Sequence, residues 1–278
     1  MRHLAAPPLL ALHRMLAMGR RPPKGAVRLV ILHDVLEAQQ DALARLAAHA
    51  KARFGLATPG WAQARLAGKG SADGAAPVLF GFDDGFASNF AAARAVLDPL
   101  GLKAVFFVCP GLVDLPPERR QAAVAEQVFR GRAQSAPDLM GWEDIKALAA
   151  AGHAIGCHGF DHTALAELPA AELERQVAGA ADRLEQVLGR PTPWFAFPFG
   201  DIGSIDSAAL AAVGACFPLC RSGIRGLAHA GTHPLALPAE SVDLSASWAW
   251  QRLALEGGLA PLYNGDRARL DAMARQRP

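Results

Sequence analysis

The sequence lacks several features that would place it in a common class of protein. Its formal net charge is only +2, and acidic and basic residues are interspersed, so it has no basic stripe that would neutralise nucleic-acid phosphates. Its longest uninterrupted apolar stretch is shorter than the roughly 18 residues that span a bilayer. Internal repeats and low-complexity linkers are absent as well. These absences argue against a nucleic-acid partner, a transmembrane helix and a repeat architecture.

Cysteine is also scarce, with only four residues in the chain. Cys216 and Cys220 are the only two that lie close together in the sequence, and a C-x3-C pair without a second pair is a weak metal signal. We therefore expect buried free thiols rather than a zinc knuckle. Free thiols are consistent with a reducing compartment.

The first 25 residues resemble a signal peptide only in part. Their apolar run contains Pro7 and Pro8, is broken by His13 and Arg14, and is not followed by a small-x-small cleavage site. We expect residues 1–25 to form a flexible or peripheral leader and residues 26–278 to form a single domain. A cytoplasmic location follows from this reading, with a periplasmic location as the alternative. Contact of this Arg-bearing amphipathic segment with a membrane surface also stays open.

Beyond this leader, short apolar runs alternate with helical patterns. A hydrophobic fraction of 51% is enough for a sizeable core. The apolar runs predict strands within residues 27–35, 77–85, 103–110, 153–160, 193–200, 216–220 and 235–243. Helical patterns occupy residues 41–54, a short segment near Trp61, and residues 89–101, 142–152, 169–189 and 206–214.

This alternation predicts an α/β fold with parallel strands joined by right-handed crossovers. About seven such units suit either a barrel or a doubly wound sheet. In both architectures the chemistry belongs at the carboxyl ends of the strands, so polar residues at those ends are the candidates for function.

Four of the predicted strands end in polar or loop-forming residues. These are His33 and Asp34, Asp83 and Asp84, His158 and His162, and the group Pro198, Gly200 and Asp201. Alone, an Asp-Asp-Gly sequence is often only a turn, and two histidines four residues apart are common on surfaces. Together, each at the end of its own strand, they point to one site.

The chemistry of these residues suggests a divalent metal ion. Adjacent carboxylates repel each other unless a cation or a shared proton lies between them, and two neutral imidazoles can bind one ion. We expect Asp84, His158 and His162 to be the ligands, which leaves coordination positions open for catalysis. Asp83 then remains as the general base.

Three sequence blocks resemble motifs of the polysaccharide deacetylases of the NodB-homology type (carbohydrate esterase family 4). They are FDDG at 82–85, HGFDH at 158–162 and FPFG at 197–200. The resemblance implies a distorted (β/α)7-type barrel in which Asp83 is the base and Asp84, His158 and His162 bind the metal. It also implies a substrate groove walled by Pro198, Phe199 and Gly200, with the N–H of Phe199 facing the oxyanion.

The sequence departs from the family pattern in two places. The arginine that usually opens the third motif and holds the base is replaced by Ala196. The histidine-bearing last motif is missing near the C-terminus, whereas ILHD at 31–34 is similar to it. That arrangement resembles the circularly permuted poly-N-acetylglucosamine deacetylases and implies His33 as the general acid, with Asp34 as an orienting partner. His233 is the rival for this role, but it precedes a predicted strand rather than following one.

The resemblance implies a metal-dependent enzyme that removes N-acetyl groups from an N-acetylhexosamine-containing polysaccharide or glycan precursor. The metal is expected to be zinc, with cobalt or nickel as alternatives. Two other functions stay open, namely hydrolysis of another acyl bond (an O-acetyl ester or a cyclic amide) and carbohydrate binding without catalysis. The intact ligand set argues against the second.

Overall fold

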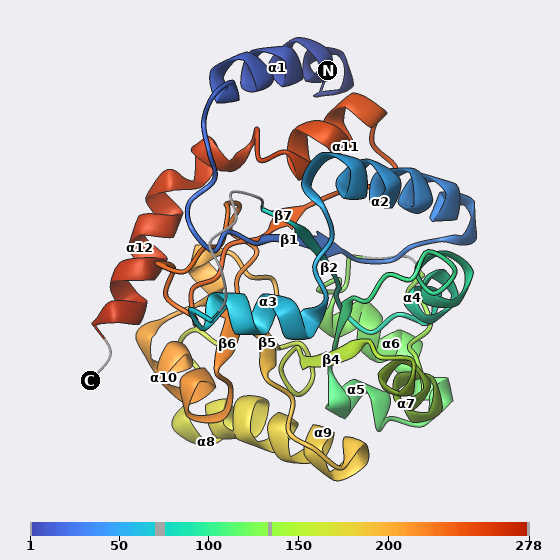
Figure 1. Cartoon of the computed structure of the whole chain (residues 1–278). Coiled ribbons are helices and arrows are strands. Elements are labelled where there is room, and N and C mark those ends of the chain that lie inside the picture. The colour runs from blue at the N-terminus through green and yellow to red at the C-terminus, as the bar shows by residue number, and fades with distance from the viewer. Residues whose placement is uncertain (1, 70–75, 133–134, 277–278) are drawn as a thin grey trace.

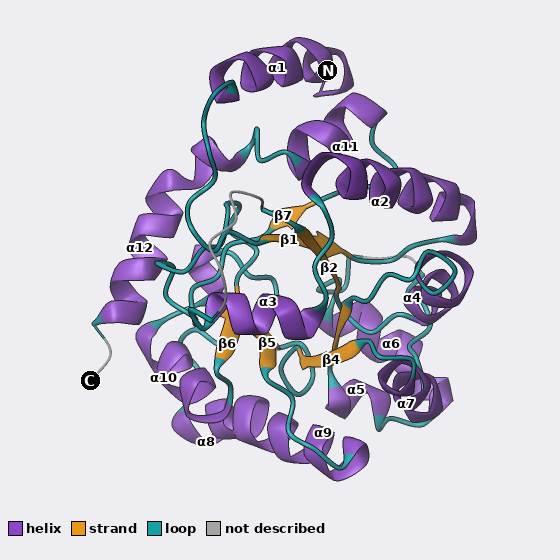
Figure 2. Cartoon of the chain, in the orientation of Figure 1, coloured by secondary structure: helices purple, strands orange, loops and turns teal. Residues whose placement is uncertain are grey.

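The computed structural model describes residues 2–69, 76–132 and 135–276 of the chain. A seven-stranded sheet lies at its centre, with helices around it (Figures 1 and 2). Its order is β6-β5-β4-β3-β2-β1-β7, and every pairing is parallel. The strands are β1 (Arg28–Leu32), β2 (Val78–Phe82), β3 (Val105–Val108), β4 (Ala154–Cys157), β5 (Trp194–Ala196), β6 (Leu219–Arg221) and β7 (Glu240–Ser241). Six of them lie within the predicted apolar runs, and β6 begins in the seventh and extends one residue beyond it.

The two edges of the curled sheet are joined by one short segment. Leu237 donates its N–H to Cys220 on the β6 side, at 3.0 Å, and accepts a bond from Ser222 at 2.9 Å. A few residues later β7 pairs with β1, and the N–H of Val242 bonds to Ile31 at 3.0 Å. The same stretch of chain therefore serves both edges, and the expected distorted (β/α)7 barrel is confirmed.

The helices are shorter and more numerous than the sequence patterns indicate. The predicted helix at 169–189 is α8 and α9 joined by a π-helical turn, and the one at 89–101 is α4 followed by a second π turn. The α-helices are α1 (Arg2–Ala17), α2 (Gln40–Phe54), α3 (Pro59–Leu66), α4 (Ala87–Ala92), α5 (Pro110–Val113), α6 (Pro117–Gln127), α7 (Trp142–Ala150), α8 (Ala170–Glu174), α9 (Ala180–Leu188), α10 (Ser207–Cys216), α11 (Trp248–Leu255) and α12 (Asn264–Arg275). The π turns are η2 (Ala93–Leu97) and η3 (Arg175–Gly179), and the 3₁₀ turns are η1 (Glu37–Gln39), η4 (Ile202–Ser204) and η5 (Ala260–Tyr263).

Residues of the strands alternate between two apolar layers, as the pleat requires. In β1, Val30 and Leu32 face the helices, whereas Leu29 and Ile31 belong to a second cluster inside the barrel. Both faces are buried, which explains why the strands read as continuous apolar runs. Phe107 occupies the interior beside Gly156, where an added Cβ would lie 2.4 Å from its ring.

The N-terminal segment is helical in the structure. α1 is the outermost element in Figure 1 and packs against α11. Arg14 donates two hydrogen bonds to the carboxylate of Glu256, at 2.9 and 2.5 Å. None of the helices in the described part of the chain has the length and apolar character needed to cross a membrane. The division into residues 1–25 and 26–278 stays a prediction.

Of the four cysteines, three are buried and Cys216 is exposed, and all are free thiols. Cys216 ends α10, whereas Cys220 is in β6. The expectation of free thiols is confirmed, and the expectation that all four are buried is wrong for Cys216.

Candidate active site

The two histidines and the aspartate predicted to bind metal meet at the carboxyl end of the barrel. Asp84 follows β2, and its Oδ1 lies 3.5 Å from Nε2 of His158 and 3.2 Å from Nε2 of His162. The three side chains are almost fully buried, and their donor atoms lie within 4.8 Å of one another. β2 and β4 are separated by β3 in the sheet, so the barrel's curvature is what brings these residues together.

Backbone carbonyls orient both imidazole rings. Nδ1 of His158 lies 2.8 Å from the carbonyl oxygen of Ala196, and Nδ1 of His162 lies 3.3 Å from that of Gln127. A carbonyl can only accept a hydrogen bond, so each Nδ1 must carry the proton. Each Nε2 then points at the cluster, and in the neutral ring this atom carries the lone pair that a metal-binding histidine needs.

Three non-glycine residues of the site adopt a left-handed backbone. The φ angles are +69° for Asp84, +67° for His162 and +60° for Phe199. Such conformations cost of order 1–3 kcal/mol each and persist where the surroundings enforce them. Gly200 shows how tightly these loops pack, because a Cβ there would lie only 2.4 Å from the backbone nitrogen of Gly223.

The charges of the cluster are mutually stabilised. Burial acts to raise the pKa of Asp84, but hydrogen bonds from His158 and His162 hold it well below its usual range. Burial acts to lower the pKa of His158, but the hydrogen bond that the protonated ring donates to Asp84, together with the negative charges of Asp83 and Asp84, outweighs that effect and raises it. When both rings are neutral, the ionised carboxylate and the two Nε2 lone pairs of this buried cluster fit a divalent cation, with two nitrogens and one oxygen as donors.

Asp83, the predicted base, is held by an arginine that the sequence analysis missed. Arg221 ends β6 and donates a hydrogen bond from Nη2 to Oδ1 of Asp83, with both side chains buried. Its guanidinium lies 4.5 Å over the ring of Phe107. Oδ2 of Asp83 faces the cluster, 4.0 Å from Nε2 of His158.

Arg221 accounts for the missing arginine of the third motif. Ala196 and Arg221 are register partners on the neighbouring strands β5 and β6. The guanidinium therefore reaches Asp83 from β6, the strand next to the one that carries the arginine in the usual family motif. The rule that polar residues at strand ends are candidates for function would have identified Arg221, because it directly follows the apolar run CFPLC.

A cavity of about 580 Å³ opens over the cluster. His33, which follows β1, and Asp34 both line it, whereas His233 is not among its lining residues. Asp34 accepts a 2.5 Å hydrogen bond from Ser88 on α4. Among the described residues, no hydrogen bond joins Asp34 to His33.

Of the three groove residues, only Phe199 lines the cavity. Its ring lies edge-on to that of His162, with centroids 4.5 Å apart, and the guanidinium of Arg130 is 3.6 Å from its centroid. Its backbone N–H has no hydrogen-bond partner within the described part of the chain. Pro198 and Gly200 are buried beneath the loop, and Pro198 packs on Gly159.

The loop between the two histidines is held from behind by Gln176. This fully buried residue lies in the π turn η3, and its Oε1 accepts the N–H of Phe160 at 2.9 Å and that of Asp161 at 3.3 Å. Its Nε2 donates to the carboxylate of Asp161. π-helical turns often occur at functional sites, and here the turn presents Gln176 to the loop that carries His162.

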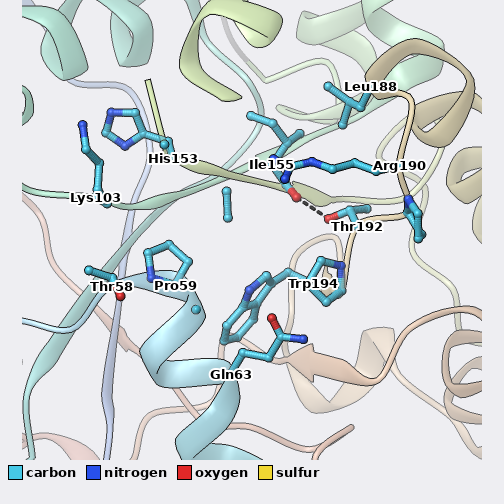
Figure 3. A pocket seen from close by; sticks show the side chains of 15 residues that line it. Thr58, Pro59, Gln63, Lys103, His153, Ile155, Leu188, Arg190, Thr192 and Trp194 are labelled. Atoms are coloured by element: carbon cyan, nitrogen blue, oxygen red, sulfur yellow. Dashed lines mark hydrogen bonds between the residues drawn. The ribbon is translucent and has the colours of Figure 1, made fainter. Parts of the chain in front are cut away.

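Figure 3 shows a second pocket, of about 410 Å³. It is lined by residues around the starts of β3, β4 and β5, including Lys103, His153 and Trp194, and by parts of α3 and the end of α9, so it lies at the end of the barrel opposite the cluster. Nε2 of His153 lies 3.2 Å from Asp98, and Nδ1 accepts the N–H of Ala104 at 3.1 Å. None of the sequence-predicted site residues lies there.

The barrel and the site together define a class of carbohydrate-active hydrolase. The chain belongs to the polysaccharide deacetylase family, whose model matches residues 71–215. The resemblance inferred from the three motifs is confirmed, and the protein is a carbohydrate deacetylase.

Solved structures share the fold over most of their length. IcaB from Ammonifex degensii is 23% identical, with a TM-score of 0.62 over 81% of this chain and 97% of that one. PplD from Streptococcus pyogenes is 16% identical, with a TM-score of 0.63 over 85% and 98%. A de-N-acetylase from Aggregatibacter actinomycetemcomitans is 12% identical, with a TM-score of 0.64 over 82% and 98%. No protein of curated function matches the sequence.

Proposed function

We propose that the protein is a metal-dependent N-deacetylase that releases acetate from N-acetylhexosamine units of a polysaccharide or a glycan precursor. Asp84, His158 and His162 hold the ion, with zinc as the expected metal and cobalt or nickel as substitutes. The observation that carries the proposal is the convergence of one carboxylate and two imidazoles, each with Nδ1 beside a backbone carbonyl, in a buried cluster that lines the cavity. When bound, a divalent ion polarises a carbonyl and lowers the pKa of water at the site.

Asp83 acts as the general base in this proposal. Arg221 fixes Oδ1 of Asp83, so Oδ2 is left to take a proton from the attacking water. The unpartnered N–H of Phe199 donates to the oxygen that becomes negative as the acetyl carbon turns tetrahedral. His33, at the open side of the cavity, gives a proton to the departing amine, which is a poor leaving group until it is protonated.

The first test measures bound metal and acetate release together. Wild-type protein should contain about one ion per chain and release acetate from N-acetylglucosamine oligomers. Asp84→Ala should lose both, because the cluster loses its carboxylate. Asp98→Ala, beside the histidine at the opposite end of the barrel, is the matched control and should keep both. Wild type that holds metal without releasing acetate from any N-acetyl sugar would redirect the proposal to another acyl bond.

The general acid is tested separately with His33→Ala. Acetate release from an N-acetyl sugar should fall about 100-fold or more, while the bound metal is retained. Hydrolysis of an O-acetyl ester should fall less, because an alkoxide leaves more easily than an amide nitrogen. His233→Ala is the matched control. Full amide activity in His33→Ala, or its loss in His233→Ala, would overturn the assignment.

A further inference from the structure

The outer face of α1 carries an unusual concentration of exposed apolar side chains. Leu9, Leu12 and Leu16 are 42%, 48% and 56% exposed, and Met15 and Met18 are 61% and 78% exposed. The three leucines follow the spacing i, i+3, i+7, which places them on one helix face. We call these five residues the α1 apolar face, although Met18 lies just beyond the end of the helix; all five are exposed, whereas Ala6 and Leu10 of α1 are buried.

The other side of α1 attaches the helix to the rest of the protein. Ala6 and Leu10 are buried, and His13 lies 3.1 Å from the backbone oxygen of Glu256. Arg14 pairs with the side chain of the same residue. The helix is thus attached through one side, and its apolar side is free to meet a partner.

Positive charge surrounds this end of the chain. Residues 1–33 contain six arginines and lysines and no aspartate or glutamate. Arg20, Arg21 and Lys24 directly follow α1 and are exposed. A cavity of about 320 Å³ at the C-terminal end of α1 is lined by five arginines: Arg14, Arg20, Arg21, Arg28 and Arg53.

The most buried of these arginines lacks a hydrogen-bond partner for one of its nitrogens. Arg28 is only 7% exposed, and its Nε has no hydrogen-bond partner in the described part of the chain. The sole acidic residue lining the cavity, Glu256, is already paired with Arg14. The cavity therefore presents a surplus of positive charge with donors available to an anion.

We propose that α1 and the basic segment that follows it dock on an anionic lipid bilayer. Leu9, Leu12 and Leu16 would enter the headgroup–acyl boundary, while Arg20 and Arg21 meet the lipid phosphates. A second copy of this chain is a poorer occupant, because pairing two such faces would bring two sets of like charges together. The inference does not depend on the proposed metal chemistry.

Sedimentation with vesicles tests this docking. The full chain should bind vesicles of 70:30 phosphatidylcholine and phosphatidylglycerol at low salt, and pure phosphatidylcholine much more weakly. The double variant Leu12→Gln/Leu16→Gln should partition about tenfold less or lower. Leu36→Gln/Leu262→Gln, which alters two exposed leucines elsewhere, is the matched control and should bind like wild type. Arg20→Gln/Arg21→Gln should lose the preference for anionic vesicles.

Three results would overturn the proposal. The first is that wild type does not sediment with anionic vesicles. The second is that Leu12→Gln/Leu16→Gln binds them as wild type does. The third is a dimer in solution that dissociates in that variant, which would make the α1 apolar face an interface between copies. Acetate release in the absence of vesicles, compared between the variant and its control, verifies that the fold is intact.

Discussion

β4 separates two buried histidines, of which we propose that only one binds metal. His153 precedes the strand at the amino end of the barrel, and His158 follows it at the carboxyl end. Each lies near an aspartate, and each ring is at most 3% exposed. They differ in the backbone group that meets Nδ1, which is an N–H of Ala104 for His153 and a carbonyl of Ala196 for His158.

That difference is our reason for proposing His158, and not His153, as a metal ligand. Nδ1 of His153 must accept, so Nε2 carries the proton and donates it to Asp98, and no lone pair remains. Nδ1 of His158 must donate, so Nε2 is the atom that faces Asp84, and in the neutral ring it has a lone pair for a metal ion. Burial, a nearby aspartate and a pocket are common to both ends, so none of these three features identifies the site. The two ends differ in the ring nitrogen that the backbone leaves for a metal ion, and we use this difference to choose the site.

The largest expected effect comes from replacing each of the two histidines in turn. His158→Ala should lose tight metal binding and lower acetate release on the order of a thousandfold, since a bound ion is worth several kcal/mol to the transition state. His153→Gln should keep the metal and the activity but lose about 1–3 kcal/mol of unfolding free energy, because a buried hydrogen-bonded group is altered. Metal analysis, acetate release and urea unfolding of both variants make the comparison. A loss of metal in His153→Gln would contradict the proposed difference between the two histidines.

Arg221 should have the next largest effect. Arg221→Met leaves Asp83 without its orienting partner, so we expect kcat for acetate release to fall about 10- to 100-fold with the metal retained. Arg221→Lys, which keeps the charge, should recover part of the rate. The double variant Ala196→Arg/Arg221→Ala moves the guanidinium to the strand that carries it in the usual family motif and should also recover activity. Undiminished kcat in Arg221→Met would show that Asp83 needs no such partner.

Gln176 supports the loop that carries His162, so a substitution there should weaken zinc binding at the carboxyl end of the barrel. Gln176→Glu keeps an acceptor for the N–H groups of Phe160 and Asp161 but replaces the amide donor with an oxygen facing the Asp161 carboxylate. We expect the Kd for zinc to rise about tenfold, because the loop carrying His162 loses a support. Chelator competition measures this, with Gln186→Glu on the exposed side of α9 as control. Equal affinities would show that Gln176 matters only for folding.

The smallest expected effect is on stability against pH. Burial lowers the pKa of His153 below its usual 6.5, so the unfolded chain binds a proton more readily than the folded one. This histidine therefore favours folding above about pH 6.5, and that contribution is lost as the pH falls below it. With chelator present, the difference in unfolding free energy between wild type and His153→Gln should shrink from pH 7.5 to 5.5. A difference that grows on acidification would contradict the assignment.

The fold was largely predictable because its signals are local. The apolar runs at 27–35 and 77–85 contain β1 and β2, since strands buried on both faces need no polar alternation. The helix α6 was not predicted, although Pro116, Pro117 and Glu118 are typical of a helix start. The π turns were unpredictable, because an inserted residue in a helix leaves its composition unchanged.

The site divides in the same way. The sequence by itself determined that Asp83, Asp84, His158 and His162 follow two of the strands, and their residue types identify the family's chemistry. Only the tertiary structure decided which atoms are free to act. The carbonyl of Gln127 that orients His162 comes from the end of α6, and the arginine that holds Asp83 comes from β6. Such partners are far away in the chain, and their position depends on how the barrel curls and closes rather than on any local pattern.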